Sequence, residues 1–241
     1  MRKFSAPPFS SSLLRFRSSY TTSPPPPPPQ TLNLKPVPPH LSEPYLAEVR
    51  SLLPRLLALG HHSDAVRLLS AALLLSPPLS SLPIPSLARH LSSLPDLAPT
   101  LALLTSLRHH PLRPSPLPFV APLLSSFLLS RRPRDAAKVF FWLCRADSPR
   151  RPDREVYEIA IGGFCRLGRM LDALRALREM ALDSVPIGGG LREEVYRGLL
   201  QEARIDEARE LDAALKGLEG GGGEFDRVAE LLDRFVRDWE E

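Results

Sequence analysis

The sequence predicts an all-α protein: a right-handed α-solenoid of about five helix-turn-helix hairpins over residues 43–218, with a C-terminal capping helix. No segment shows the sustained alternation of β-branched residues that indicates a sheet. Residues 153–187 hold two amphipathic helical patterns separated by Gly168, a residue that commonly ends a helix. A small residue near the start of each expected second helix recurs at intervals of 35 to 37 residues, and a near-constant period is typical of stacked repeats.

The first 42 residues are expected to carry a targeting signal and a linker, without packed structure. Arg2, Lys3, Arg15 and Arg17 lie among many serines, and the first acidic residue is Glu43. This acid-free, Arg- and Ser-rich composition is typical of an organellar transit peptide, with a mitochondrial destination favoured over a plastid one. A disordered basic tail is the alternative. The proline run that follows predicts an extended linker.

The repeat pattern depends on one small residue in each hairpin, which we call the landmark residue. The five landmark residues are Ala65, Thr100, Ala136, Ala173 and Ala208, at intervals of 35, 36, 37 and 35. Apolar residues lie seven positions after all five and four positions after the first four, on the same helical face. A small side chain at this position fits a place where the second helix of a hairpin closely approaches a neighbouring backbone.

Two parts of the array are expected to be less regular. Prolines in the second and third hairpins predict loops or shortened helices; they are Pro85, Pro95, Pro99, Pro116, Pro118 and Pro122. The fifth hairpin is predicted to be shortened, because Tyr196 precedes its landmark by twelve residues, whereas Tyr157 precedes Ala173 by sixteen. Residues 188–190, all glycine, are interpreted as a linker between the last two hairpins.

The end of the chain, residues 219–241, predicts an amphipathic helix after glycines at 220–223 that form a flexible joint or a helix stop. Its apolar stripe includes Phe225, Leu232, Phe235 and Trp239, which are separated by three, four or seven residues. One interpretation is a cap that covers the open face of the last hairpin. The other is a partner-binding or dimerising helix that lies in a groove.

The hairpin at 153–187 resembles the pentatricopeptide repeat (PPR) family, in the manner of a short plant-type organellar member with degenerate repeats. The family pattern has an aromatic residue early in the first helix, a glycine at the turn, an acidic residue followed by alanine in the second helix, and a methionine late in that helix. The residues that carry the resemblance are Tyr157, Ile161, Cys165, Gly168, Arg169, Asp172, Ala173, Leu177 and Met180. The period also fits that family, whereas the tetratricopeptide period is nearer 34 and its Trp/Gly/Tyr pattern is missing. An ordinary helical hairpin of a solenoid or bundle is the alternative.

The resemblance implies an organellar RNA-binding protein that acts in RNA processing, splicing, stability or translation. In that family each repeat contacts one base through a residue just after the first-helix aromatic and a residue at the end of the repeat. These positions match Glu158 and Gly188, and neither is a residue that the family usually has there. We therefore expect single-stranded RNA to bind with low sequence selectivity. The alternative is a non-catalytic protein–protein scaffold in an organellar ribonucleoprotein, such as the mitochondrial ribosome.

Charge is divided unevenly along the chain. Residues 43–152 carry thirteen basic and six acidic groups, whereas residues 153–241 carry thirteen basic and twenty-one acidic groups. This asymmetry predicts a polyanionic partner at the basic half, or a basic protein partner at the acidic half. The candidate nucleic-acid-binding residues are Arg50, Arg55, Arg131, Arg132, Arg134 and Glu158. An RNA-binding protein should gather the arginines along one groove, whereas a scaffold should scatter them and expose an apolar patch near Trp239.

No motif indicates catalysis or a cofactor. The sequence has no P-loop, no dinucleotide-binding glycine motif and no deaminase-type zinc motif. Cys144 and Cys165 are expected to be buried free thiols, and the adjacent histidines at 61–62 and 109–110 suit solvated turns better than a metal site. Residues 68–88 are uncharged, but four prolines there oppose a membrane span. The prediction is a non-enzyme without cofactor, metal, small-molecule substrate or membrane.

Overall fold

The computed structural model describes four stretches of the chain, residues 43–74, 84–109, 115–219 and 225–240. Every regular element in these stretches is an α-helix and none is a strand, which confirms the predicted all-α class for this part of the protein. The expected transit peptide and linker at 1–42 and the glycine joint at 220–223 lie outside the described residues.

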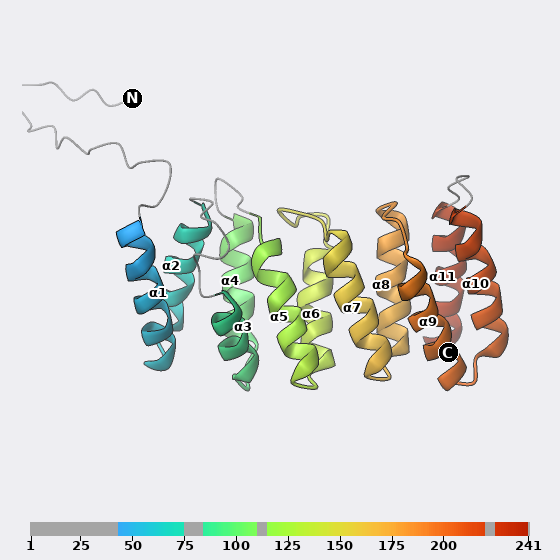
Figure 1. The fold of residues 1–241 in the computed structure, drawn as a ribbon, viewed down its shortest axis with the longest axis horizontal. Coiled ribbons are helices and arrows are strands. Elements are labelled where there is room, and N and C mark those ends of the chain that lie inside the picture. The colour runs from blue at the N-terminus through green and yellow to red at the C-terminus, as the bar shows by residue number, and fades with distance from the viewer. Residues whose placement is uncertain (1–42, 75–83, 110–114, 220–224, 241) are drawn as a thin grey trace, which may run out of the picture. The chain divides into compact units, whose positions relative to one another are not determined.

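Five pairs of helices follow one another along the chain, each pair joined by three or four residues (Figure 1). The first members are α1 (Glu43–Ala58), α3 (Ile84–Ser93), α5 (Leu117–Leu129), α7 (Arg154–Arg166) and α9 (Gly189–Gln201). The second members are α2 (His62–Leu74), α4 (Ala98–His109), α6 (Pro133–Leu143), α8 (Met170–Leu182) and α10 (Ile205–Glu219). The last helix of the described chain is α11 (Phe225–Glu240).

Helices that are close in the sequence pack against one another. The first members of the pairs contact each other in chain order, from α1 through α3, α5 and α7 to α9. Behind them in Figure 1 lie the second members, of which α2 contacts α4. The exception to chain order is α11, which packs against α8 as well as against α10.

The five landmark residues are all buried, as the sequence predicted. Ala65 is 3% exposed, and Thr100, Ala136, Ala173 and Ala208 are fully buried. The residues seven positions later are buried as well; they are Ala72, Leu107, Leu143, Met180 and Leu215. The landmark face of each second helix therefore lies in the core.

Four of the five connections end their first helix with the same arrangement. The residue five positions before the landmark has a positive φ, namely 78° at Gly60, 54° at Arg131, 64° at Gly168 and 60° at Ala203. The amide of the following residue donates to the carbonyl oxygen five residues before it, over 2.8 to 3.0 Å; the donor–acceptor pairs are His61–Leu56, Arg132–Phe127, Arg169–Phe164 and Arg204–Leu199. These are Schellman motifs, which satisfy carbonyl groups that a helix end leaves unpaired.

The second connection differs because a proline occupies the corresponding position. The ring of Pro95 holds φ near −65° and excludes the left-handed conformation. Here the Asp96 carboxylate accepts a hydrogen bond of 2.9 Å from the Ala98 amide at the start of α4. This side-chain cap satisfies an N–H group of the following helix, whereas the carbonyl groups at the end of α3 need a donor from elsewhere.

The prolines disturb the helices less than expected. Pro85, Pro99 and Pro118 occupy first turns, where no backbone N–H is needed. Pro122 lies inside α5, which still has 13 residues, and the clearly shortened helix is α3 with 10 residues. Among the described residues, no helix is both long and apolar enough to cross a bilayer.

The prediction of a shortened fifth hairpin is wrong. Helices α9 and α7 both have 13 residues, and each begins nineteen residues before its landmark. The residue that corresponds to Tyr157 is therefore Arg192, and Tyr196 lies one turn later. Gly189 and Gly190 are also not a linker, because they form the first residues of α9.

The left-handed turn residues generate the first prediction. A Cβ at Gly168 would meet no atom within 4 Å, so Gly168→Ala changes only the backbone preference. We expect it to lower the free energy of unfolding by about 1 kcal/mol, measured by urea denaturation, because a left-handed φ disfavours any residue with a Cβ. Ala203→Gly should raise it by a similar amount.

The matched control is Ala47→Gly at an exposed position inside α1, which should destabilise by about 1 kcal/mol. If Ala203→Gly destabilises as much as Ala47→Gly, the left-handed turn residue does not determine the stability of the last pair.

Candidate nucleic-acid interface

The five candidate arginines lie on two separate parts of the fold. Arg50 and Arg55 are exposed on α1, whereas the other three lie at the turn between α5 and α6. Helix α3 packs between α1 and α5. The structure therefore does not bring these arginines together in a single groove.

Arg132 has a structural role that the sequence did not reveal. Its guanidinium donates to the Ser92 carbonyl oxygen over 2.7 Å and also to the Leu94 carbonyl oxygen, both at the C-terminal end of α3. It also donates to Asp135 over 2.7 Å and lies 5.1 Å from the centroid of the Phe127 ring. Arg132 thus supplies hydrogen bonds at the end of the one first helix that has no Schellman motif, and it is poorly placed to contact RNA.

Arg131 and Arg134, which lie at the same turn, remain available for contact with a nucleic acid. Both side chains are exposed, and neither has an ion-pair or hydrogen-bond partner among the described residues. Arg131 borders a groove of about 470 Å³ between α5 and α7. Its lining is mainly apolar with two arginines: Ser125, Leu128, Leu129, Arg131, Ile159, Gly163, Arg166 and Leu167. A Cβ on Gly163 would lie 2.3 Å from the Leu128 side chain, so a larger residue here would force that side chain to move.

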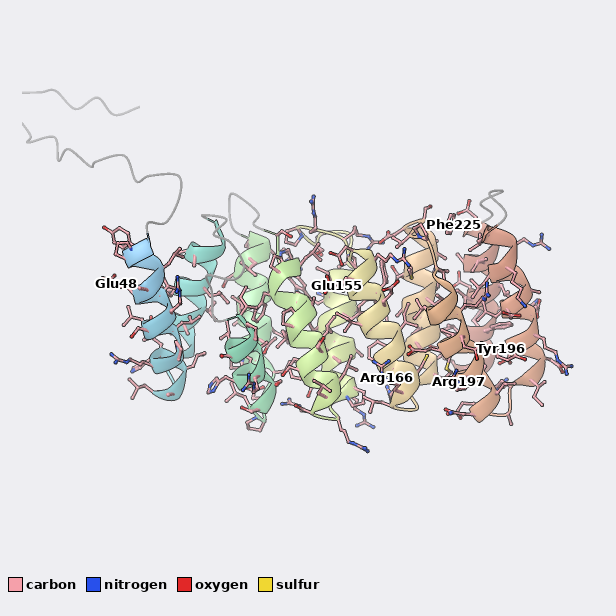
Figure 2. All side chains as sticks on the ribbon, in the orientation of Figure 1. Glu48, Glu155, Arg166, Tyr196, Arg197 and Phe225 are labelled. Carbon is pink, nitrogen blue, oxygen red and sulfur yellow. The ribbon has the colours of Figure 1, made fainter. Side chains whose placement is uncertain are left out.

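Sequence reasoning missed Arg166 as a candidate. It lies at the end of α7, towards the same edge as Arg197 of α9 (Figure 2). Its side chain is 63% exposed and binds Glu194 over 3.1 Å. The sequence offered one signal for it, because Arg166 lies two residues before Gly168 and therefore at the end of the first helix of its pair.

The two expected base-reading positions lie next to each other. Gly188 is the N-cap residue of α9, and a Cβ on it would lie 4.0 Å from the Glu158 carboxylate. Arg154 fills the space between them, because it binds Glu158 over 2.7 Å and its Nη2 lies 2.9 Å from the same Cβ position. The Glu158 side chain is 42% exposed, so the pair presents a neutralised carboxylate to solvent.

Most basic side chains after residue 153 are neutralised by carboxylates. The pairs are Arg154–Glu158, Arg166–Glu194, Arg169–Asp172, Arg175–Glu240, Arg178–Asp233, Arg192–Asp212, Arg197–Glu193, Arg204–Glu207, Lys216–Asp212 and Arg234–Glu210. In the described part of residues 43–152, by contrast, eight exposed basic side chains have no ion-pair partner. They are Arg55, Arg67, Arg89, Arg131, Arg134, Lys138, Arg145 and Arg150. Uncompensated positive charge is therefore concentrated in the first half of the array.

The aromatic residue of the best repeat is part of a buried polar contact. Tyr157 donates a hydrogen bond of 2.6 Å to Asp183 just after α8, and burial together with this bond raises its pKa. Arg151 binds the same carboxylate over 2.7 Å and also donates to the Cys144 carbonyl oxygen. These bonds fasten the connection between α6 and α7 to the end of α8.

The C-terminal helix uses its apolar stripe inside the protein. Leu232 and Phe235 are buried, and α11 lies between α8 and α10 (Figure 1). Trp239 is half-buried, with the Arg204 guanidinium 5.1 Å from its ring centroid and its indole N–H donating to Glu207. Phe225 is half-buried at the start of the helix.

This placement corrects the interpretation of the stripe as a partner-binding surface, because its central residues are buried. It also changes the interpretation of this helix as a cap on the open face of the last hairpin. The helix packs on the second members of the last two pairs, α8 and α10, so it does not simply cover the outer face of the last pair.

Both cysteines are buried free thiols, as predicted. Burial raises the pKa of Cys144, and it raises the pKa of Cys165 to about 12. Neither thiol is therefore activated as a nucleophile at neutral pH. The described residues contain no cluster of three or more His, Cys, Asp or Glu side chains that could hold a metal ion.

The chain matches no protein-family model and no curated protein. Its function is therefore inferred from the arrangement of its own residues.

The capping role of Arg132 generates the second prediction. Arg132→Ala leaves the Ser92 and Leu94 carbonyl groups without their donor, and we expect the free energy of unfolding to fall by about 1–3 kcal/mol. Urea denaturation followed by circular dichroism measures this change.

The matched controls are Arg131→Ala and Arg134→Ala, which remove the same charge from exposed side chains and should change stability by less than about 0.5 kcal/mol. Equal effects at all three positions would show that Arg132 has no special structural role.

Proposed function

We propose that this chain is a non-catalytic RNA-binding protein that acts on organellar RNA in processing, splicing, stability or translation. The observation that supports this function is the uneven pairing of charge. Eight exposed basic side chains of the first half, those named above, have no carboxylate partner among the described residues, and such side chains can neutralise phosphates and release counterions. The second half is acidic and largely paired, so contact with a polyanion is directed to the first half.

The proposal includes a finer description of the fold. The five helix pairs would form a right-handed α-solenoid of hairpins like those of the PPR family. Two recurrences support this arrangement: the buried landmark residues and the four Schellman turns at matching positions. In arrays of this kind each pair buries its apolar face on its neighbours, which the contacts from α1 through α9 also favour.

RNA binding of this kind would have low sequence selectivity. Glu158 is already bound by Arg154, and Gly188 has no side chain with which to contact a base edge. Backbone contacts through arginine position a nucleic acid without reading its sequence. Affinity would therefore depend strongly on salt and weakly on sequence.

A second candidate function is a protein–protein scaffold in an organellar ribonucleoprotein. It is favoured by the separation of Arg50 and Arg55 on α1 from Arg131 and Arg134 at the α5–α6 turn. Exposed apolar side chains on α1 also favour it; they are Tyr45, Leu52 and Leu59.

RNA binding generates the third prediction. The double substitution Arg131→Gln and Arg134→Gln should weaken the binding of A-rich, U-rich and mixed single-stranded RNAs by similar factors. The slope of log K against log salt should flatten by about 1.4, since each lost phosphate contact removes about 0.7. Fluorescence anisotropy between 50 and 200 mM salt measures both effects.

The matched control replaces Arg154 and Arg197 by Gln. This removes the same charge from two arginines that already bind carboxylates, so the slope should change much less. Absence of RNA binding at low salt would favour the scaffold, and a strong preference for one short sequence would contradict the proposed lack of selectivity.

Import into mitochondria is the fourth prediction. The Arg- and Ser-rich, acid-free composition of residues 1–42 supports it. A fusion of residues 1–45 to a fluorescent protein should accumulate in mitochondria, and replacement of Arg2, Lys3, Arg15 and Arg17 by Gln should abolish this accumulation. Fluorescence that stays in the cytosol or enters only plastids would refute the proposed destination.

A further inference from the structure

Helix α1 has an exposed apolar stripe at the N-terminal end of the helix array. Tyr45 is 57% exposed, Leu52 45% and Leu59 73%. Their spacing of seven residues places all three on one side of the helix. Leu59 directly follows α1 and continues its hydrogen bonding, because its amide donates to the Arg55 carbonyl oxygen over 3.0 Å.

The side of α1 next to this stripe is already packed. Leu46, Val49, Leu53 and Leu57 are buried, and the helix contacts α2 and α3. The exposed stripe is therefore the outer margin of the apolar face of α1, which α2 and α3 leave uncovered. Exposed apolar surface of this kind commonly marks an interaction site.

Two opposite charges lie along one flank of the stripe. Glu48 is four residues before Leu52, Arg55 is three residues after it, and at 100° per residue both project to the same side of the stripe. Both side chains are exposed and have no ion-pair partner among the described residues. Glu48 projects outward from α1, away from the other helices (Figure 2).

We propose that this face binds a second copy of the chain, with the two α1 helices antiparallel and crossing at Leu52. In this arrangement Tyr45 of each copy contacts the partner's Leu59, and the two Leu52 side chains contact each other. A two-fold axis through this point brings the charged flanks together. With a rise of 1.5 Å per residue, Glu48 lies about 6 Å to one side of the crossing point and the partner's Arg55 about 4.5 Å to the same side.

The charges select this orientation. Two antiparallel helices form two Glu48–Arg55 pairs, whereas two parallel helices in register place the charged flanks on opposite sides of the contact and form no such pair. The self-complementary pattern identifies a second copy as the occupant, because a two-fold interface uses the same residues on both sides. The contact area is small, so the dimer should be weak, with a dissociation constant on the order of tens of micromolar.

Dimerisation through α1 is a property separate from RNA binding, and the two are compatible. Residues 43–152 carry the uncompensated positive charge, so dimerisation through α1 would place two basic halves side by side. Arg55 would then take part in the dimer, which would leave Arg131 and Arg134 for nucleic acid.

Sedimentation equilibrium of the full chain tests the proposal. The mass should rise with concentration from 26.7 kDa towards twice that value. Leu52→Glu should keep the protein monomeric over the same range, with an unchanged circular dichroism spectrum because the side chain is exposed. A chain that is monomeric at all concentrations, or a dimer that Leu52→Glu does not weaken, overturns the proposal.

Charge reversal tests the antiparallel orientation. Glu48→Arg and Arg55→Glu should each weaken self-association by about tenfold or more. An equal mixture of these two variants should dimerise at least as well as the unmodified chain, since every contact then joins Arg to Glu. Arg67→Glu on α2 is the matched control for Arg55→Glu and should change nothing. If mixing restores no dimer, the antiparallel arrangement is wrong.

Discussion

The helix pairs depend on a turn in which one residue takes a left-handed conformation and the next amide caps the preceding helix. In all five pairs the landmark residue lies seven residues after the end of the first helix, also in the second pair, which reaches the same spacing without this turn. Because that number is constant, the landmark residue always reaches the core, where a small side chain fits. Where Pro95 prevents the turn, the neighbouring pair supplies Arg132 to the helix end.

Arg132, which the sequence assigned to RNA, serves the fold, and so does Tyr157, the aromatic residue of the best repeat. Arg132 and Tyr157 both satisfy polar groups that helix packing would otherwise leave without partners. Arg132 joins the second and third pairs, so it also stabilises the order in which the pairs stack, whereas Tyr157 joins the two helices of the fourth pair. The positive charge that remains for a partner is consequently smaller than the composition implies, and it lies mainly in the first half of the array.

Part of this structure could be predicted from the sequence. Small residues at a constant spacing revealed the five pairs and the buried face of each second helix. The left-handed turns at Arg131 and Ala203 were not visible, because neither residue is glycine. The length of α9 was also misjudged, because Tyr196 was aligned with Tyr157 although the turn, and not the aromatic residue, sets the register. The sequence revealed the charge asymmetry, but the carboxylate that binds each arginine depends on which helices are neighbours in space.

The position of α11 has a consequence for cooperativity. In an ideal repeat array each unit touches only the units before and after it, so the array can lose terminal units one at a time. Here α11 lies between α8 and α10, and Arg175 binds Glu240 across 65 positions of the sequence. The fourth and fifth pairs and the last helix therefore share one set of contacts. This end of the protein should open as a single unit, while the α1 end can fray pair by pair.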